Sequence, residues 1–384
     1  MMVLLVFLPE FMKDIDWLSN LKLRASWGKL GNNSIGNYEW QALYGSGYNY
    51  AFNSNKSNGL AMTTFSNYAL EWEETAITNI GLDFGVLNNR LNGTIEVYDK
   101  KTDGILYRPT LPESLNQFTS PLQNLAGVNN KGLEITLGWN DRVGDISYSV
   151  SGNFTYNKNK VTKYKGELVR EWRTDANGNK VWYQNVGTVA NGSSNLIVEG
   201  HEMNEYYMMN PYKGNGSYFN SDGTVNINGG PKDGMIRTEA DMKWLQAMFD
   251  AGYKFYPNQA IGKDKIWYGD MIYADYNGDG IYGNDDDRDF QSVSWRPKYY
   301  FGLQASMTWK GFDLSMNWAG AAGFKIDYYK QTQNSVSVTH GYGLGYDIAY
   351  DHYFFDPENP NDPRTNIYSE TPRLVGYQNS GQAS

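Results

Sequence analysis

Residues 299–318 read YYFGLQASMTWKGFDLSMNW. Up to Trp309 the odd-numbered positions are apolar or aromatic, and the positions between them are mostly small or polar. After Lys310 and Gly311 the apolar residues stand at even-numbered positions, from Phe312 to Trp318. Successive side chains of a β-strand point to opposite faces. The stretch therefore predicts two strands joined by a tight turn, with one apolar face and one polar face.

The same alternation recurs through the N-terminal half of the chain. It covers residues 21–27, 80–86, 91–97, 133–139 and 146–156. Short turns separate the second of these from the third, and the fourth from the fifth. Further strands are expected within residues 38–52 and 196–199. The pattern predicts an all-β fold built from antiparallel hairpins.

Three features favour a membrane barrel over a soluble sandwich. Several predicted strands have about 10 residues or more, which is enough to cross a bilayer at a tilt. Very short turns alternate with long polar segments, of which residues 165–297 form the longest, as in barrels with short periplasmic turns and long extracellular loops. Aromatic residues stand at strand ends, where an interfacial girdle lies; they are Trp27, Trp139, Tyr156, Trp309 and Trp318. We therefore expect a transmembrane antiparallel β-barrel, with a soluble β-rich adhesin or binding protein as the alternative.

Composition excludes several other functions. The 384 residues carry a net charge of −9 with no dense basic run, which argues against nucleic acid as a partner. There is no cysteine, and hence no thiolate metal site or cysteine nucleophile. The sequence has no nucleophile elbow, phosphate-binding loop or H-E-x-x-H motif, and its three histidines lie in unrelated loops. No enzyme activity is predicted.

Several segments resemble a known family. They are residues 11–24 (FMKDIDWLSNLKLR), residues 70–83, residues 129–134 (NNKGLE), and Gly269-Asp270 with the loop at 275–286. In this order they resemble the barrel of SusC/RagA-type TonB-dependent transporters of the outer membrane. The resemblance implies a plugged barrel that imports oligosaccharides or peptides, works with a SusD-like surface lipoprotein and draws energy from TonB. A siderophore or cobalamin receptor barrel is the alternative within this class.

The same resemblance predicts a partial barrel, in which the plug and the closing strands are missing. Residues 1–10 form an atypical start that does not match the family. Residues 11–384 form the barrel portion, with the long outer loop at about 165–297 and a loop tail at 326–384.

The loop that starts at Asp275 has the spacing of a calcium site. Oxygen ligands at positions 1, 3 and 5, a glycine at position 6 and a carbonyl at position 7 resemble an EF-hand loop, and position 12 is an aspartate. The predicted ligands are Asp275, Asn277, Asp279, the carbonyl of Ile281, and Asp286, with Asp285 and Asp287 as alternatives to Asp286. Calcium would be structural and would stiffen an outer loop. The alternative is a loop rich in Asp and Asn turns that needs no metal.

Aromatic residues in the long loop are candidates for substrate binding, because their rings stack on sugars or grip peptides. The candidates are Trp182, Tyr183, Tyr206, Tyr207, Trp267 and Tyr268. Packing of the loop is the alternative role for each of them. Residues 241–249 also predict a short amphipathic helix, as a lid or a partner contact, with Trp244, Leu245 and Met248 on one side.

Overall fold

The computed structural model describes residues 2–7, 15–109, 111, 114, 118–192, 194–326 and 346–374. The chain divides into two compact units. The sheet unit comprises Met1–Arg170, Asn185–Glu205 and Ser292–Lys325, and the loop unit comprises Glu171–Gln184, Tyr206–Gln291 and Ile326–Ser384.

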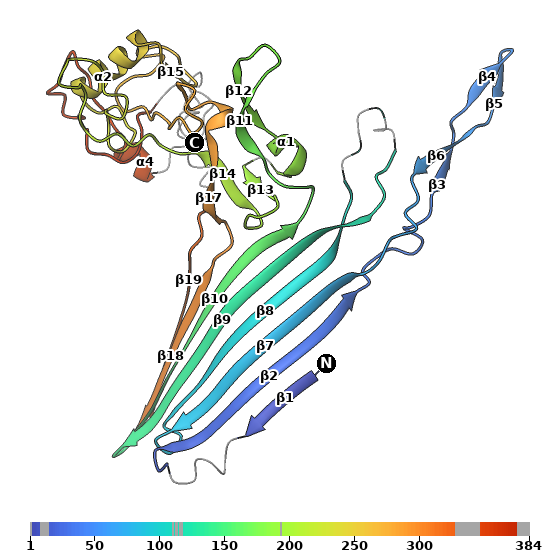
Figure 1. The fold of residues 1–384 in the computed structure, drawn as a ribbon. Helices are drawn as coiled ribbons and strands as arrows, with labels where there is room; N and C mark the ends of the chain where they lie inside the picture. The colour runs from blue at the N-terminus through green and yellow to red at the C-terminus, as the bar shows by residue number, and fades with distance from the viewer. Residues whose placement is uncertain are drawn as a thin grey trace. The chain divides into compact units, whose positions relative to one another are not determined.

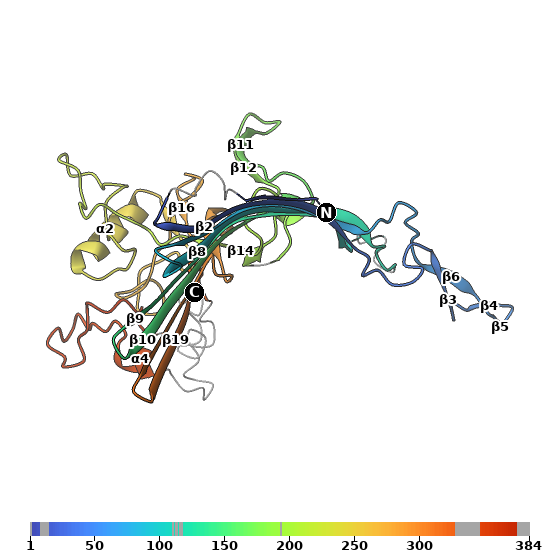
Figure 2. The ribbon, with the colours of Figure 1, turned by 90° about the horizontal axis from the view of Figure 1, so that it is seen from below.

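The sheet unit contains one eight-stranded sheet, in which every neighbouring pair of strands is antiparallel. Figure 1 shows these strands side by side, and Figure 2 shows the sheet as a curved layer. In spatial order they are β1 (Met2–Phe7), β2 (Leu18–Asn32), β7 (Glu73–Val86), β8 (Leu91–Tyr107), β9 (Gln123–Val143), β10 (Ile146–Lys163), β18 (Tyr299–Trp309) and β19 (Phe312–Ala322). The predicted all-β fold with antiparallel hairpins is confirmed, and the sheet is the wall of a partial barrel.

The turns at one edge of the sheet are tight. Leu87, Asn88 and Asn89, between β7 and β8, all have positive φ angles of 55–63°. Gly144, between β9 and β10, has φ 59°, and Gly311, between β18 and β19, has φ 88°. The connections at the opposite edge are long, with residues 33–72, 108–122 and 164–298 lying between strands. This asymmetry matches the predicted arrangement of short turns and long loops.

The first residues of the chain form part of the sheet. Met2–Phe7 is strand β1, which pairs with Lys22 to Trp27 of β2. The sequence had set residues 1–10 apart as an atypical start, but a run of apolar residues without helix-period spacing also suits a strand. Within the described residues, β1 and β19 each pair on one side only.

Short strands and a helix lie within the long connections. In the connection after β2, β3 (Leu43–Ser46) pairs with β6 (Leu60–Thr64), and β4 (Tyr50–Phe52) pairs with β5 (Asn55–Ser57). A three-stranded sheet contains β13 (Asn195–Leu196), β14 (Glu205–Met209) and β17 (Arg288–Ser294), and α1 (Val186–Val189) precedes it.

The loop unit has a hydrophobic core of its own. Two short strand pairs lie in this unit: β11 (Arg170–Thr174) with β12 (Lys180–Gln184), and β15 (Lys254–Phe255) with β16 (Ile281–Tyr282). Its described helices are α2 (Glu239–Asp250), the 3₁₀ helix η2 (Asp285–Asp287) and α4 (Tyr346–Tyr350). Trp244, Leu245 and Met248 of α2 are each 0% exposed and pack with Ile236 and Ile266. The apolar side of the predicted helix thus belongs to the unit's own core and is neither a lid face nor a partner contact.

Helix α2 begins at a capping box. The Thr238 side chain accepts a hydrogen bond from the backbone N–H of Asp241, and the Asp241 carboxylate accepts one from the backbone N–H of Thr238. This reciprocal pair satisfies two of the backbone donors that a helix start leaves open. In the described part of the chain, no helix is both long enough and apolar enough to cross a membrane.

Candidate functional site

One face of the sheet carries rows of exposed apolar side chains. In one row Leu82, Ile95, Ile135, Phe154 and Phe301 stand opposite one another on neighbouring strands. Ile95 is 38% exposed and Phe301 is 49% exposed, in strands of 17 and 11 residues. A contiguous exposed apolar surface of this kind marks contact with lipid or with another protein.

The opposite face carries charges that bridge three strands. Arg24 of β2 donates to both carboxylate oxygens of Asp83 on β7, at 2.8 and 2.9 Å, and to Glu96 on β8 at 3.1 Å. Thr94 donates to Asp83 at 3.0 Å, and Asn79 donates to Glu96. The side chains of Arg24, Asp83 and Glu96 are 21–30% exposed. The network suits a wall that faces water on this side and lipid on the other.

Gly81 makes room for this network. It pairs with both Arg24 and Glu96, in the strand between them. A Cβ atom at Gly81 would lie 2.8 Å from the Arg24 guanidinium. The guanidinium therefore crosses the middle strand over a residue without a side chain and reaches the carboxylate beyond it.

The predicted calcium loop is closed by its own hydrogen bonds. The Asp275 carboxylate accepts from the backbone N–H groups of Gly278 at 2.6 Å and Gly280 at 2.8 Å. The Asn277 side chain accepts from the N–H of Asp279 at 3.1 Å, and Asp279 accepts from the N–H of Ile281 at 2.8 Å. These are the Asp and Asn turns of the alternative interpretation.

The carboxylate expected at position 12 is bound by a side chain from another segment. Asp286 accepts a hydrogen bond from Gln184 at 2.5 Å, whereas the next residue, Asp287, is 1% exposed and accepts from the N–H of Tyr276 at 2.7 Å and of Asn284 at 3.0 Å. Burial raises the pKa of Asp287 to about 6. Among the described residues, no group of three or more His, Cys, Asp or Glu side chains is arranged to hold a metal ion. The calcium site stays a prediction.

Four of the predicted binding aromatics pack within the loop unit. Trp182 lies edge-on to Trp172, with ring centroids 5.6 Å apart, and Tyr207 packs on Phe290 at 4.8 Å. Tyr206 and Tyr207 are each 5% exposed. Tyr183 is more open, and the Arg173 guanidinium lies 3.5 Å from its ring centroid. For Tyr206 and Tyr207 the burial favours the packing role.

Trp182 also lines an open groove beside the predicted calcium loop. The groove has a volume of about 800 Å³ and is lined by Trp172, Trp182, Lys180, Asp279 and Asp286, among others. The structure thus brings one predicted aromatic residue next to two predicted calcium ligands. The sequence had treated the two sets as separate.

Trp267 and Tyr268 line a second cavity, of about 450 Å³. Its other walls come from residues 352–357 and from Arg373 and Leu374 in the tail. Tyr268 lies edge-on to Trp267 at 5.3 Å and to Phe355 at 5.1 Å. The volume falls within the range of small-molecule pockets in proteins.

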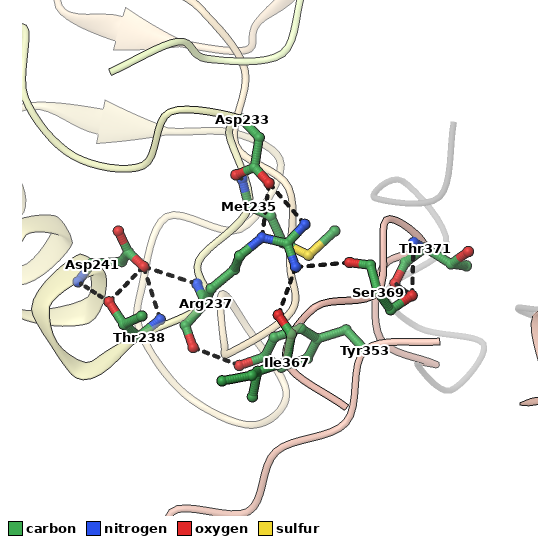
Figure 3. Close-up of polar contacts among 9 residues, drawn as sticks. All are labelled: Asp233, Met235, Arg237, Thr238, Asp241, Tyr353, Ile367, Ser369 and Thr371. Carbon is green, nitrogen blue, oxygen red and sulfur yellow. Dashed lines mark hydrogen bonds and ion pairs between the residues drawn. The ribbon is translucent and has the colours of Figure 1, made fainter. Parts of the chain in front are cut away.

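An arginine in the long loop holds the tail that completes this cavity. The Arg237 guanidinium donates to the carbonyls of Ile367 at 2.8 Å and Ser369 at 2.7 Å, and to Asp233 at 2.8 Å. The Tyr353 hydroxyl donates back to the Arg237 carbonyl at 2.7 Å. Figure 3 shows Arg237 between Asp233 on one side and Ile367 and Ser369 on the other. No motif in the sequence pointed to this residue.

Comparisons with known proteins match the part of the chain that forms the sheet to TonB-dependent receptors. The family model described as "TonB dependent receptor-like, beta-barrel" matches residues 15–181. The TonB-dependent receptor SusC of Bacteroides thetaiotaomicron is 34% identical over 194 residues, which are 47% of this chain and 19% of SusC. A TonB-dependent receptor of Formosa agariphila is 33% identical over 227 residues, 56% of this chain and 21% of that receptor.

Solved structures show the same fold. The structure titled "Structure of the RagAB peptide transporter" has a TM-score of 0.62 at 19% identity. The match covers 97% of this chain and 33% of the RagAB chain. The RagAB peptide importer in its closed-closed state has a TM-score of 0.60 at 20% identity, over 97% of this chain and 34% of its own. Residues 15–181 thus match the β-barrel of TonB-dependent receptors, and the chain is similar to receptors of the SusC/RagA type. It spans about a fifth of the length of the curated relatives that it matches.

The region matched by the family model is mainly the sheet. Residues 15–181 include β2 to β10, whereas the cavity at Trp267 lies in the loop unit and outside the matched residues. The family match therefore concerns the sheet, and it does not extend to the candidate binding residues around Trp267.

Proposed function

We propose that the chain forms part of the wall of an outer-membrane importer that takes up oligosaccharides or peptides with energy from TonB. The observation that carries this proposal is the two-faced sheet, with exposed apolar rows on one side and the Arg24 network on the other. The proposed partners are a SusD-like surface lipoprotein and the TonB system. No catalytic role is part of the proposal.

The physical argument concerns where the apolar face is stable. Phe301, Leu303, Leu314 and Trp318 are each 46–51% exposed in the structure. In water such a surface promotes aggregation. In a bilayer the same side chains contact lipid tails, which are equally apolar, so their exposure has no unfavourable free energy. A soluble adhesin would need a second layer over this face.

The comparisons assign no substrate class to this chain. The RagAB neighbours are titled a peptide transporter and a peptide importer, and they share the fold at about 20% identity. The relatives with higher identity are named only as TonB-dependent receptors. We keep oligosaccharides and peptides together, and a siderophore or cobalamin receptor is the alternative that the uptake assay below tests.

Cysteine labelling tests the membrane orientation of the sheet. The sequence contains no cysteine, so each introduced cysteine is the only one in the chain. Leu303→Cys on the apolar face and Gln304→Cys on the polar face form a matched pair of neighbours in β18. In cells, a lipid-soluble nitroxide quencher should quench a bimane label at 303 more strongly than a label at 304. Equal quenching at both positions would exclude a lipid-facing sheet.

Uptake tests the cargo. Cells in which the gene is deleted should lose uptake of a labelled oligosaccharide or peptide, and dissipating the proton gradient in wild-type cells should cause the same loss. Cobalamin and ferric-siderophore uptake serve as controls. Loss of these alone would favour the alternative receptor class.

A further inference from the structure

We propose that a group of lysines on the apolar face of the sheet binds the phosphate groups of a lipid in the outer leaflet of the membrane. The lysines are Lys101 of β8, Lys131 of β9, and Lys158 and Lys160 of β10. These four residues form the lysine patch, on three strands that lie side by side in the sheet unit (Figure 1). The site rests on the proposed function, because its position requires that the apolar face contacts lipid.

The lysine patch begins where the apolar band of the sheet ends. On β10 every second side chain from Ile146 to Tyr156 is apolar, aromatic or glycine, and Lys158 is the next residue on the same face. With a rise of about 3.4 Å per residue and a tilt of about 40°, the stretch from Ile146 to Tyr156 spans roughly 25 Å of membrane, which is the height of the apolar band of such barrels. The Tyr156 ring stacks on Tyr299 of β18 at 5.2 Å, as in an aromatic girdle. Lys158 and Lys160 therefore lie at the level of the lipid head groups, at the edge where the long connections leave the sheet.

Cross-strand pairing brings the lysine patch together. Lys131 of β9 stands directly opposite Lys158, and Asn129 of β9 stands opposite both Lys160 and Lys101. The register has no shift between these residues and the apolar rows, so all four lysines lie on the apolar face. Neighbouring strands are about 4.8 Å apart, which lets ammonium groups of adjacent strands reach one phosphate group. Like charges directly opposite each other are unfavourable, and an anion between Lys131 and Lys158 removes this repulsion.

The lysine patch has more positive charge than its aspartates neutralise. Lys131 is paired with Asp99 and Lys101 is paired with Asp103, each at 2.9 Å. The two lysines of β10 are exposed and form no ion pair with any residue that the structure describes. Two aspartates thus face four lysines, which leaves an excess of two positive charges for a ligand.

Three further acids at this edge of the sheet lie next to cations of their own. They are Glu74 paired with Lys29, Glu202 paired with Lys298, and Glu199, which accepts the backbone N–H of Tyr164 between Lys163 and Lys165. These acids therefore leave the excess of the lysine patch in place.

A phosphorylated lipid fits this arrangement better than other anions do. The apolar rows below the lysine patch require lipid tails, and the same strands carry both surfaces, so one lipid molecule contacts the rows with its tails and the lysines with its phosphate. Lysine ammonium groups bind phosphate as compact point charges. The attraction is stronger beside the low-dielectric membrane than in open water. An acidic protein would find only the lysines, because the membrane already covers the rows beneath them.

Native mass spectrometry of the detergent-solubilised protein tests this site, with monophosphoryl lipid A as the probe. Lys158→Gln and Lys160→Gln should each weaken binding about fivefold, and the double glutamine variant about 25-fold. Lys158→Arg with Lys160→Arg keeps both charges and should bind as the wild type does. Lys100→Gln is the matched control, because Lys100 is the exposed neighbour of Lys101 on the other face of β8, and it should leave the affinity unchanged.

Two further probes identify the source of the anion. Lipid A without phosphate should bind the wild type and the double glutamine variant alike, and millimolar inorganic phosphate should not displace the phosphorylated lipid. Displacement by inorganic phosphate would reassign the lysine patch to a free anion and overturn the lipid site. Equal affinity of the wild type and the double glutamine variant for the phosphorylated lipid would also overturn it. If the double variant fails the gel shift for a folded barrel, Lys160→Gln and the arginine pair decide the question by the same comparison.

The bimane labels at positions 303 and 304 separate this site from the proposed function. Stronger quenching at 303, together with unaltered lipid binding by the double glutamine variant, rejects the lysine patch alone. Equal quenching at both positions rejects the lipid-facing sheet, and with it the importer wall, whatever lipid binding is measured.

Discussion

Arg373 and Asp270 form a bidentate ion pair across 103 residues of sequence, with nitrogen–oxygen distances of 2.6 and 2.8 Å. Asp270 is 1% exposed, and its burial raises the pKa of its carboxyl, while the Arg373 guanidinium lowers it. The pair joins the tail to the long loop. It also supports the backbone of Lys263 and Trp267 at the cavity that these residues line.

Removal of Arg373 should therefore destabilise the loop unit. Arg373→Met leaves the buried Asp270 carboxylate without a cation, and breaking a buried pair in this way costs about 3–5 kcal/mol. Pulse proteolysis of the solubilised protein should show earlier cleavage within residues 206–291. The control is Arg364→Met, which removes an ion pair with Asp362 at the surface of the same tail and should leave the cleavage profile unchanged. The same early cleavage in both variants would contradict a specific role for the buried pair.

The Arg24 network should stabilise the sheet. Arg24→Leu leaves Asp83 and Glu96 on neighbouring strands without their shared cation, and each charged hydrogen bond contributes about 1.5–3 kcal/mol. The variant should unfold at lower urea concentration in liposomes, as followed by the gel shift between folded and unfolded barrel. Lys29→Leu removes an ion pair of more exposed side chains on the same strand and should change little. An unchanged midpoint for Arg24→Leu would show that the network adds nothing to stability.

A buried glutamate, Glu205, should make the pairing of β14 with β17 sensitive to acid. Burial would raise the pKa of Glu205, but hydrogen bonds from His201, Ser292 and Glu202 keep this pKa below its usual value. A carboxyl with a lowered pKa stabilises the fold above its unfolded-state pKa, and this contribution is lost as the pH falls through the folded-state pKa. Amide exchange at Ser292, which donates to Glu205 at 2.6 Å, should accelerate below about pH 4.5 after correction for intrinsic rates.

The matched variants for this pH effect are Glu205→Gln and Glu239→Gln. The first should exchange faster at neutral pH and lose most of the acid dependence. The second alters a carboxylate that is 75% exposed and should follow the wild type. Identical pH profiles for wild type and Glu205→Gln would assign the acid effect to another group.

Calcium binding by the loop at residues 275–286 is directly testable. If the loop binds calcium as an extracellular module does, isothermal titration should give a dissociation constant of about 10⁻⁴–10⁻³ M. Calcium should then protect this loop from proteolysis, and a chelator should reverse the protection. Asp275→Asn should abolish both effects, whereas Asp264→Asn, outside the loop, should not. Protection that does not depend on calcium would leave the Asp and Asn turns as the whole explanation.

The hairpins were predictable because their information is local. In β18 and β19 the alternation of apolar and polar residues, and the Lys310-Gly311 turn between them, lie within 20 consecutive residues. The tight turn needs a residue that adopts positive φ, and Gly311 does so at 88°. The apolar rows across the sheet follow once these strands pair in register.

The loop unit was not predictable in the same way. Its buried residues, from Tyr212 to Tyr353, are separated by long polar stretches and follow no single period, so the segment had the composition of a loop. Trp267 and Tyr268, predicted as substrate-binding aromatics, line a cavity, whereas Arg237 and Arg373 carried no motif. Their roles depend on partners more than 100 residues away.

Periodicity and turn residues were thus enough to establish the antiparallel sheet, its two faces and the edge at which the long connections lie, because each of these depends on neighbouring residues. Tertiary packing decided that the long connection and the tail fold around one core. It also decided that Asp287 rather than Asp286 is the buried carboxylate, and that Trp267 lies beside tail residues at a cavity. Such pairings depend on distances in space between residues far apart in the chain, and local patterns contain no information about those distances.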